Sequence, residues 1–243
     1  MYSLYAALAR TLPFDSELAL GGKLLYAGDM GAGAPNLLFA ANIAGAGSLA
    51  ASADPAVQRQ AIRDGVVDFL VTSLEEALRI LKNEIRKRQT VSVGVAADPQ
   101  QLVEQMLARG VLPDLLPPAS WAAAESVGAQ AQRFLTQGAI RMESPGPEPA
   151  DFVTWSVDRQ FSRWLPRLDA CAKSAIPADE LLRNRWLRLA PRYLGRLAQR
   201  ERGVALSSEE LAKLRSEVRD MLAKHAQAGD EPPTVQIGES LLG

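Results

Sequence analysis

Short apolar runs alternate with longer amphipathic stretches over the first half of the chain. The runs Lys23–Gly28, Ser48–Ser52, Val66–Val71, Val91–Ala96 and Asp114–Leu116 have the length of buried strands. The stretches between the successive runs are long enough for helices, so each strand-to-strand connection is a crossover. The pattern therefore predicts an α/β fold with a Rossmann-like, doubly wound, mostly parallel sheet covered on both faces.

Three of the intervening helices begin with recognisable signals. Ser73 and Glu76 form a Ser-x-x-Glu capping box. Asp54 and Asp98 each precede a proline directly after a predicted strand. Because aspartate before a first-turn proline is a favoured N-cap, capping is the simplest role for both carboxylates.

The second half of the chain has a different pattern. Ala119–Gly138 predicts one helix, and three prolines within Glu143–Asp151 indicate a linker. Helical stretches are predicted at Val153–Lys173, Pro177–Arg202 and Ser207–Ala228. The predicted organisation is a Rossmann-like domain with an N-terminal helical segment at 1–142, a linker at 143–151, an α-helical region at 152–230 and a flexible tail at 231–243.

Three glycines, Gly28, Gly31 and Gly33, follow the first predicted strand and precede a helix that begins near Pro35. Glycine allows positive φ and close approach of the backbone to a phosphate, and a helix N-terminus supplies N–H groups and positive potential. The spacing differs from G-x-G-x-x-G, and no lysine follows as in a Walker loop. Spacing alone therefore leaves open a phosphate-binding turn and a tight strand–helix corner without a ligand.

The composition narrows the function classes. The 243 residues are 47% hydrophobic and 23% charged with a net charge of −1, so the whole chain offers no electrostatic case for nucleic acid or an anionic membrane. A single cysteine and a single histidine exclude an internal disulfide and, within one chain, a Cys/His metal or catalytic pair. No secretory signal or stretch of about 18 apolar residues is found, so we expect a cytoplasmic protein with no membrane partner.

The C-terminal region contains an arginine-rich stretch. Leu181–Gly203 holds seven arginines together with Trp186 and Tyr193. Arginines beside aromatic residues can bind nucleic acid, but helical spacing of the apolar residues favours a solvated or acid-paired face. We therefore expect a protein partner or self-association through the C-terminal helices rather than nucleic acid. Cys171 is interpreted as a buried structural cysteine, and His225 as a helix C-terminal residue without a catalytic role.

The stretch from Gly22 to about Pro117 resembles the central NAD-binding domain of urocanase (urocanate hydratase). The resemblance lies in AGDMGAGAPNLLFAANIAGAGSLAASAD, TSLEEALRILKNEIRKRQTVSVGV and ARGVLPDLL, taken in order. The first segment is similar to the Gly-Gly-Met-Gly-Gly-Ala-Gln-Pro turn of urocanases. The resemblance implies that Gly31, Ala32, Gly33 and Ala34 lie against the pyrophosphate of NAD.

The chain departs from the urocanase pattern at several positions. Ser52 stands where the family has an acidic residue, so Asp54 is the remaining candidate for the ribose hydroxyls. Ala97-Asp98 replaces a Gly-Asn pair, and Pro117–Trp121 replaces a Thr-Asp-Gln-Thr-Ser run. The catalytic domain of urocanase, with the cysteine that bonds to nicotinamide, has no counterpart. No catalytic residue and no metal ligand are predicted, and the candidate cofactor-binding residues are Gly28, Gly31, Ala32, Gly33, Ala34, Ser52, Asp54 and Asp98.

These observations support three hypotheses. The first is a non-catalytic or repurposed urocanase-like protein that binds NAD, another nucleotide or a small anion at the Gly28–Ala34 turn. The second is a divergent urocanate-hydratase-type lyase that uses NAD as an electrophile. The third is a scaffold protein with an empty pocket.

Overall fold

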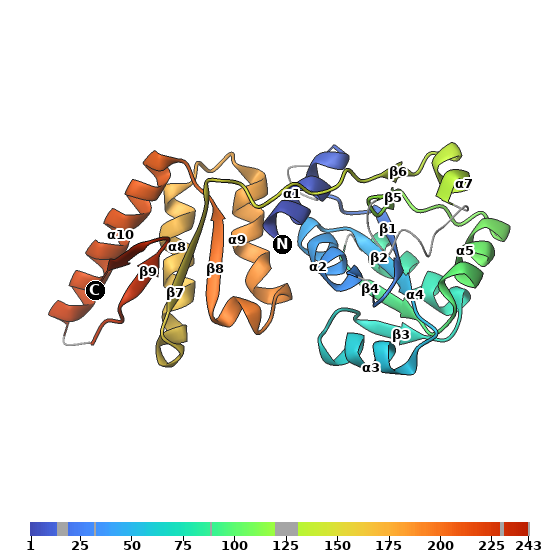
Figure 1. The fold of residues 1–243 in the computed structure, drawn as a ribbon, viewed down its shortest axis with the longest axis horizontal. Coiled ribbons are helices and arrows are strands. Elements are labelled where there is room, and N and C mark those ends of the chain that lie inside the picture. Colours follow the sequence, from blue (N-terminus) through green and yellow to red (C-terminus); the bar gives the residue numbers. More distant parts are fainter. Residues whose placement is uncertain (14–18, 32, 88, 120–130, 229–230, 243) are drawn as a thin grey trace. The chain divides into compact units, whose positions relative to one another are not determined.

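The structure, a computed structural model, describes residues 1–13, 19–31, 33–87, 89–119, 131–228 and 231–242 (Figure 1). The chain forms two compact units, Met1–Pro147 and Glu148–Gly243, and each unit has its own sheet. The division falls within residues 143–151, where the three prolines predict a linker.

The first unit is built on a six-stranded sheet with the order β3-β4-β2-β1-β5-β6. All neighbouring strands in this sheet run parallel. The strands are β1 (Leu24–Asp29), β2 (Gly47–Ala51), β3 (Phe69–Val71), β4 (Ser92–Val95), β5 (Leu115–Leu116) and β6 (Ile140–Arg141).

Helices cover both faces of this sheet. On one face, α2 packs on β1 and β2, and Asn42 of α2 accepts a hydrogen bond from Ser92 Oγ of β4. On the other face, alternate strand residues such as Tyr26 and Leu49 join a core with α4, α5 and α7. The helices are α1 (Tyr2–Thr11), which packs against α2, and α2 (Ala34–Ala44), α3 (Pro55–Arg63), α4 (Leu74–Arg86), α5 (Pro99–Ala108) and α7 (Ala131–Thr136).

The predicted fold class is confirmed by this arrangement. Each of the five predicted apolar runs overlaps a strand of the sheet, whereas β6 was not predicted because its two residues, Ile140 and Arg141, do not form an apolar run. The predicted helix Ala119–Gly138 lies partly outside the described residues, and α7 occupies part of the remainder.

The second unit combines helices with a four-stranded antiparallel sheet of order β10-β9-β7-β8. Its longest elements are helices, and α8 packs on β7 while α9 packs on β8. The strands are β7 (Phe152–Val157), β8 (Glu201–Ala205), β9 (Val235–Ile237) and β10 (Ser240–Leu242). The helices are α8 (Leu165–Ala175), α9 (Leu181–Tyr193) and α10 (Ser208–Gln227), with short 3-10 helices η2 (Arg159–Trp164) and η3 (Leu197–Gln199).

The sequence predictions for this unit were wrong where its strands lie. The predicted α-helical region 152–230 contains two strands, Phe152–Val157 and Glu201–Ala205, which pair with each other although they are distant in sequence. Phe152–Val157 also pairs with β9. The residues of the predicted tail form the β9–β10 hairpin, in which Val235 and Ile237 are buried and Gly238 takes a φ of +56°. Pairing with β7 buries one side of β9, a gain that the short segment cannot obtain alone.

Candidate functional site

The glycine-rich turn begins at the carboxyl end of β1, near the middle of the parallel sheet. Gly28 has a φ of +82° and Gly33 a φ of +84°, values that favour glycine. The pairing of β1 with β2 shifts register between Tyr26 and Gly28, so the strand is already irregular where the turn begins. Gly33 then takes the N-cap position of α2.

The turn lies at the topological switch point of the sheet. From β1 the chain passes to β2 on one side, and it later returns to β5 on the other side of β1. In open α/β sheets, ligands bind outside the carboxyl ends of the strands at such a point. Gly28, Gly31, Gly33 and Ala34 are therefore in the expected region, while Ala32 lies outside the described residues.

The conformation of the turn is fixed from within by Asp29, a residue that the sequence patterns alone did not single out. The Gly31 N–H donates to Asp29 Oδ1 at 2.7 Å, and the Gly33 N–H donates to the Gly31 carbonyl at 2.9 Å. A Cβ added at Gly31 would lie 3.0 Å from Asp29 Oδ1 and 3.7 Å from the Val57 side chain. The turn therefore lies against α3 and carries a carboxylate of its own.

Met30 anchors the turn to the sheet. Its N–H donates to the Ala51 carbonyl at 2.8 Å, and its side chain is buried. A Cβ added at Gly94 of β4 would lie 2.9 Å from the Met30 sulfur, so Met30 covers a position that only glycine leaves free. The turn is thus held to β2 and β4 at once.

The N-terminus of α2 differs from those of the next three helices. The N-cap residue of α2, Gly33, makes no side-chain cap hydrogen bond within the described residues, whereas α3, α4 and α5 are capped by Asp54, Ser73 and Asp98. An uncapped first turn leaves backbone donors and the positive end of the helix dipole for another acceptor. The α2 N-terminus is therefore the one of these four that can still receive an anionic group.

Ser52 and Asp54 are already engaged in hydrogen bonds at the end of β2. Ser52 is buried, and its hydroxyl accepts from the Asp54 N–H at 3.2 Å. Asp54 Oδ1 accepts from the Ala56 N–H at 2.7 Å, which is the predicted capping role. Asp54 itself is exposed, so its carboxylate remains accessible to solvent beside the turn.

Asp98 is also a cap, and Tyr26 connects its helix to the central strand. Asp98 Oδ1 accepts from the Gln100 and Gln101 N–H groups at 3.0 and 3.1 Å. The buried Tyr26 hydroxyl donates to the Pro99 carbonyl at 3.1 Å. Burial, and then the negative charges of Asp29 and Asp98, raise the pKa of Tyr26. The carboxyl edge of the sheet therefore has an acidic character.

The segment Pro117–Trp121, which departs from the urocanase pattern, lies only partly within the described residues. The Pro117 carbonyl accepts from Arg141 Nη1 at 3.4 Å, and residues 120 and 121 lie outside the described residues.

Cys171 and His225 both lie in the second unit. Cys171 is half-buried, and burial, followed by the charge of Glu217, raises the pKa of its thiol. His225 lies in the last turn of α10, with its ring 4.8 Å from that of Trp164.

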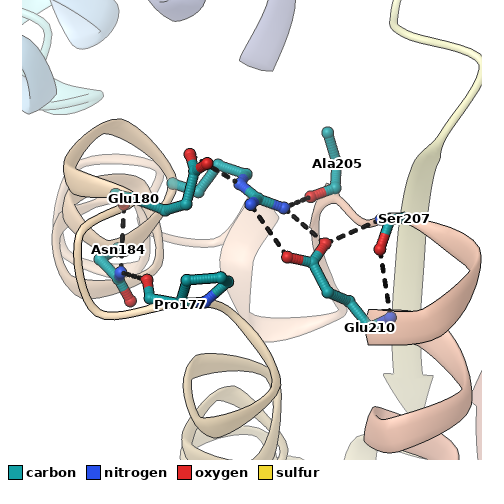
Figure 2. A network of polar contacts seen from close by, with 7 residues as sticks. Pro177, Glu180, Asn184, Ala205, Ser207 and Glu210 are labelled. Atoms are coloured by element: carbon teal, nitrogen blue, oxygen red, sulfur yellow. Dashed lines mark hydrogen bonds and ion pairs between the residues drawn. The ribbon is translucent and has the colours of Figure 1, made fainter.

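Some arginines of the stretch Leu181–Gly203 form ion pairs with carboxylates, and others are exposed to solvent. Arg183 makes a bidentate ion pair with Glu210, with N–O distances of 2.6 and 2.9 Å, and also donates to the Ala205 carbonyl (Figure 2). Arg202 pairs with Asp169. Arg188, Arg192, Arg196 and Arg200 are exposed. The stretch thus contains both acid-paired and solvent-exposed arginines, the two states that the helical spacing favours.

The described residues contain neither a metal-binding cluster nor a membrane-spanning helix. Within them, no group of three or more His, Cys, Asp or Glu side chains is placed to hold a metal ion. None of the helices built from this part of the chain is long and apolar enough to cross a membrane.

The family is identified by comparison with known proteins. A family model described as the urocanase Rossmann-like domain matches residues 3–128, just over half of the 243-residue chain. The matched range contains strands β1–β5 and the glycine turn, and it ends before the second unit begins. The chain belongs to the urocanase family through this Rossmann-like domain.

Proposed function

We propose that this chain is a non-catalytic or repurposed member of the urocanase family that binds a nucleotide of the NAD type at the Gly28–Ala34 turn. The observation that carries the proposal is the N-terminus of α2, which has no side-chain cap and lies at the topological switch point of the sheet. Its N-cap residue is Gly33, which has a positive φ. Backbone N–H groups and the helix dipole at such a terminus stabilise a phosphate.

The residues present fit the phosphate part of NAD better than its ribose. Gly33 adds no side chain over the start of α2, so a phosphate can approach the backbone. Ser52 supplies no carboxylate for the ribose hydroxyls, and Asp54 is the acidic group left for them. The Asp29 carboxylate opposes a diphosphate by charge and uses the Gly31 N–H. We therefore expect weak binding that is limited by Asp29.

The non-catalytic assignment is supported by the state of the cysteine. A nucleophilic thiol has a lowered pKa in an electropositive environment. Burial and Glu217 instead raise the pKa of Cys171, which lies in α8 of the second unit. Cys171 therefore has the character of a structural thiol rather than of a nucleophile.

Calorimetric titration with NAD, NADP, ATP and AMP tests the site. We expect Gly33→Leu to abolish binding, since the side chain fills the phosphate approach, and Asp29→Asn to tighten NAD binding about fivefold by removing a like charge while keeping an acceptor for Gly31. Gly110→Leu is the matched control, because Gly110 also has a positive φ, +65°, with open space around it. No binding by any nucleotide at millimolar concentration, or binding unchanged in Gly33→Leu, contradicts the proposal.

A separate assay addresses the lyase hypothesis. Urocanate absorbance is followed in the presence of the protein and NAD, and we expect it to stay constant. Decay above a control without protein would show that the chain is a urocanate-hydratase-type lyase, and the non-catalytic assignment would then be wrong.

A further inference from the structure

The second unit contains a groove lined by the C-terminus of α8, the segment that joins α8 to α9, and residues of α9 and α10. Its lining consists of Lys173, residues 174–178, Asn184 and Lys213, and we name it the helix-end groove. Its volume is about 700 Å³. Sites for whole small molecules typically measure ~300–1,000 Å³, so the groove has the size of a ligand site. It belongs wholly to the second unit, whereas the glycine turn belongs to the first.

Hydrogen bonds between the elements hold the walls of the groove. Lys213 Nζ of α10 donates to the Ser174 carbonyl in the last turn of α8 at 2.6 Å. Asn184 Nδ2 of α9 donates to the Pro177 carbonyl at 2.8 Å (Figure 2). The ion pair between Arg183 and Glu210 joins α9 to α10. These contacts are made by the protein alone, so the groove is formed before a ligand binds.

The lining is basic. It contains two lysines, Lys173 and Lys213, and no acidic residue. Both lysines are exposed, and within the described residues neither forms an ion pair with a carboxylate. An ammonium group has three donors, and the bond to Ser174 uses one of those of Lys213. Lys213 is therefore held in place with two donors left for an anion, which forms charge-assisted hydrogen bonds with ammonium groups.

The nearest carboxylates in the sequence lie outside the lining. Glu217 accepts a hydrogen bond from the Ser174 hydroxyl, and Glu180 pairs with Arg183. Asp179 is exposed and forms no ion pair within the described residues. These charges reduce the attraction for an anion, but they do not occupy the lysine donors of the groove. We therefore expect binding in the millimolar range.

The remaining part of the lining is largely apolar. Residues 175–178 read Ala-Ile-Pro-Ala. Ala175 and Ile176 are buried, whereas Pro177 and Ala178 are exposed. An apolar group placed on Pro177 and Ala178 removes apolar surface from water, which stabilises a complex by about 25 cal/mol per Å². An inorganic ion gains nothing from this surface, so the lining fits an anion with an apolar body.

We propose that the helix-end groove binds a small organic anion, with its head group on Lys213 and Lys173 and its apolar body against Pro177 and Ala178. A carboxylate and a phosphate monoester both supply such a head group, because an ammonium group recognises either as a point charge. The proposal does not rest on nucleotide binding by the first unit.

Fluorine NMR titration of the full chain tests the groove. The probes are para-fluorobenzoate, para-fluorophenyl phosphate and the neutral para-fluorobenzyl alcohol, which share an aromatic body and differ in the head group. We expect the tighter of the two anions to bind about tenfold more strongly than the alcohol, because only an anion pairs with the lysines. The tighter anion identifies the head group. Added salt should weaken the binding of both anions but not that of the alcohol.

Lysine variants distinguish the groove from general charge attraction. Lys213→Met keeps the aliphatic stem and should weaken anion binding about fivefold without changing alcohol binding, whereas Lys213→Arg should retain anion binding. Lys224→Met is the matched control, because Lys224 is an exposed lysine of α10 outside the lining, and it should leave all probes unchanged. Lys173→Met gives the second test if circular dichroism shows that Lys213→Met does not fold.

Three results would overturn the proposal. The first is equal binding of the alcohol and both anions, or no anion binding at about 10 mM. The second is an equal loss of anion binding in Lys213→Met and Lys224→Met. The third is loss of probe binding in Gly33→Leu, which alters only the first unit and would assign the anion site to the glycine turn. If the groove is the site, Gly33→Leu leaves probe binding unchanged.

Discussion

The two units of this chain treat polar groups in opposite ways. Among the described residues of the first unit, the buried polar side chains are neutral: Asn42, Ser48, Ser52 and Ser92. Ser48 donates to Ser92, and Ser92 donates to Asn42, so they satisfy one another between α2 and the sheet. In the second unit, the nearly buried groups are charged, and the Arg183–Glu210 and Arg202–Asp169 pairs join α9 to α10 and β8 to α8.

The difference reflects how each unit is connected along the chain. Alternating strands and helices let the first unit assemble from neighbouring elements that mostly carry their own caps. The second unit joins elements that are distant in sequence, and Arg183 reaches the capping box of α10, where Ser207 and Glu210 satisfy each other (Figure 2). Single charged residues should therefore matter more to the second unit than to the first.

The largest effect is expected for Arg183→Met, which keeps the aliphatic stem and removes the charge. Glu210 would be left without its bidentate partner, with only 12% of its side chain exposed. Removing one partner of a buried pair costs about 3–5 kcal/mol, and partial exposure lowers our expectation to about 2–4 kcal/mol. Urea unfolding measures the loss. Arg188→Met, on the exposed side of the same helix, should change the free energy of unfolding by less than about 0.5 kcal/mol, and an equal loss in both variants would show that the ion pair is not the cause.

The two ion pairs should respond to pH with opposite signs. Burial raises the pKa of Asp169 despite Arg202 and Trp155. Burial also acts to raise the pKa of Glu210, but Arg183 and the Ser207 N–H lower it overall. The Asp169 contribution to stability is therefore full below its ordinary pKa of 3.8 and is lost as pH rises through the raised value. The Glu210 contribution is full above 4.5 and is lost as pH falls through the lowered value.

Unfolding of the Asp169→Asn and Glu210→Gln variants across pH 2–7 measures these contributions against the unmodified chain. We expect the stability difference for Asp169 to shrink as pH rises and the difference for Glu210 to grow. Each slope is at most about 1.4 kcal/mol per pH unit, the limit for one proton. If the stability differences of the two variants changed with pH in the same direction, the pKa values of Asp169 and Glu210 would not be shifted in opposite directions and the expectation would be wrong.

The smallest effect is expected from the local caps of the first unit. Asp98→Ala removes the acceptor of the Gln100 and Gln101 N–H groups and should cost about 1 kcal/mol, measured as a shift in the urea midpoint. Asp98→Asn keeps an acceptor and should cost less. A cost above about 3 kcal/mol would mean that the first unit also depends on a single charged residue, and the contrast between the units would fail.

Local patterns in the sequence determined most of the first unit. The apolar runs predicted five strands, and Asp54, Ser73 and Asp98 cap helices where their positions before Pro55, Leu74 and Pro99 indicate. These features were predictable because a cap or a buried strand depends on residues close along the chain. Gly28 and Gly33 were also identified from the sequence, since a turn between a strand and a helix needs positive φ.

Only the tertiary structure decided the rest. β7 is a strand because it pairs with β8 on one side and β9 on the other. β7 and β8 lie about 50 residues apart in the chain, and at that separation local propensity does not determine strand pairing. Asp29 directly follows Gly28 in the sequence, but its bond to the Gly31 N–H depends on the fold of the turn. Arg183 pairs with Glu210 and Arg202 pairs with Asp169, whereas other arginines of the same stretch are exposed. The sequence could not distinguish the two groups, because a run of charged residues does not show which side chains form ion pairs.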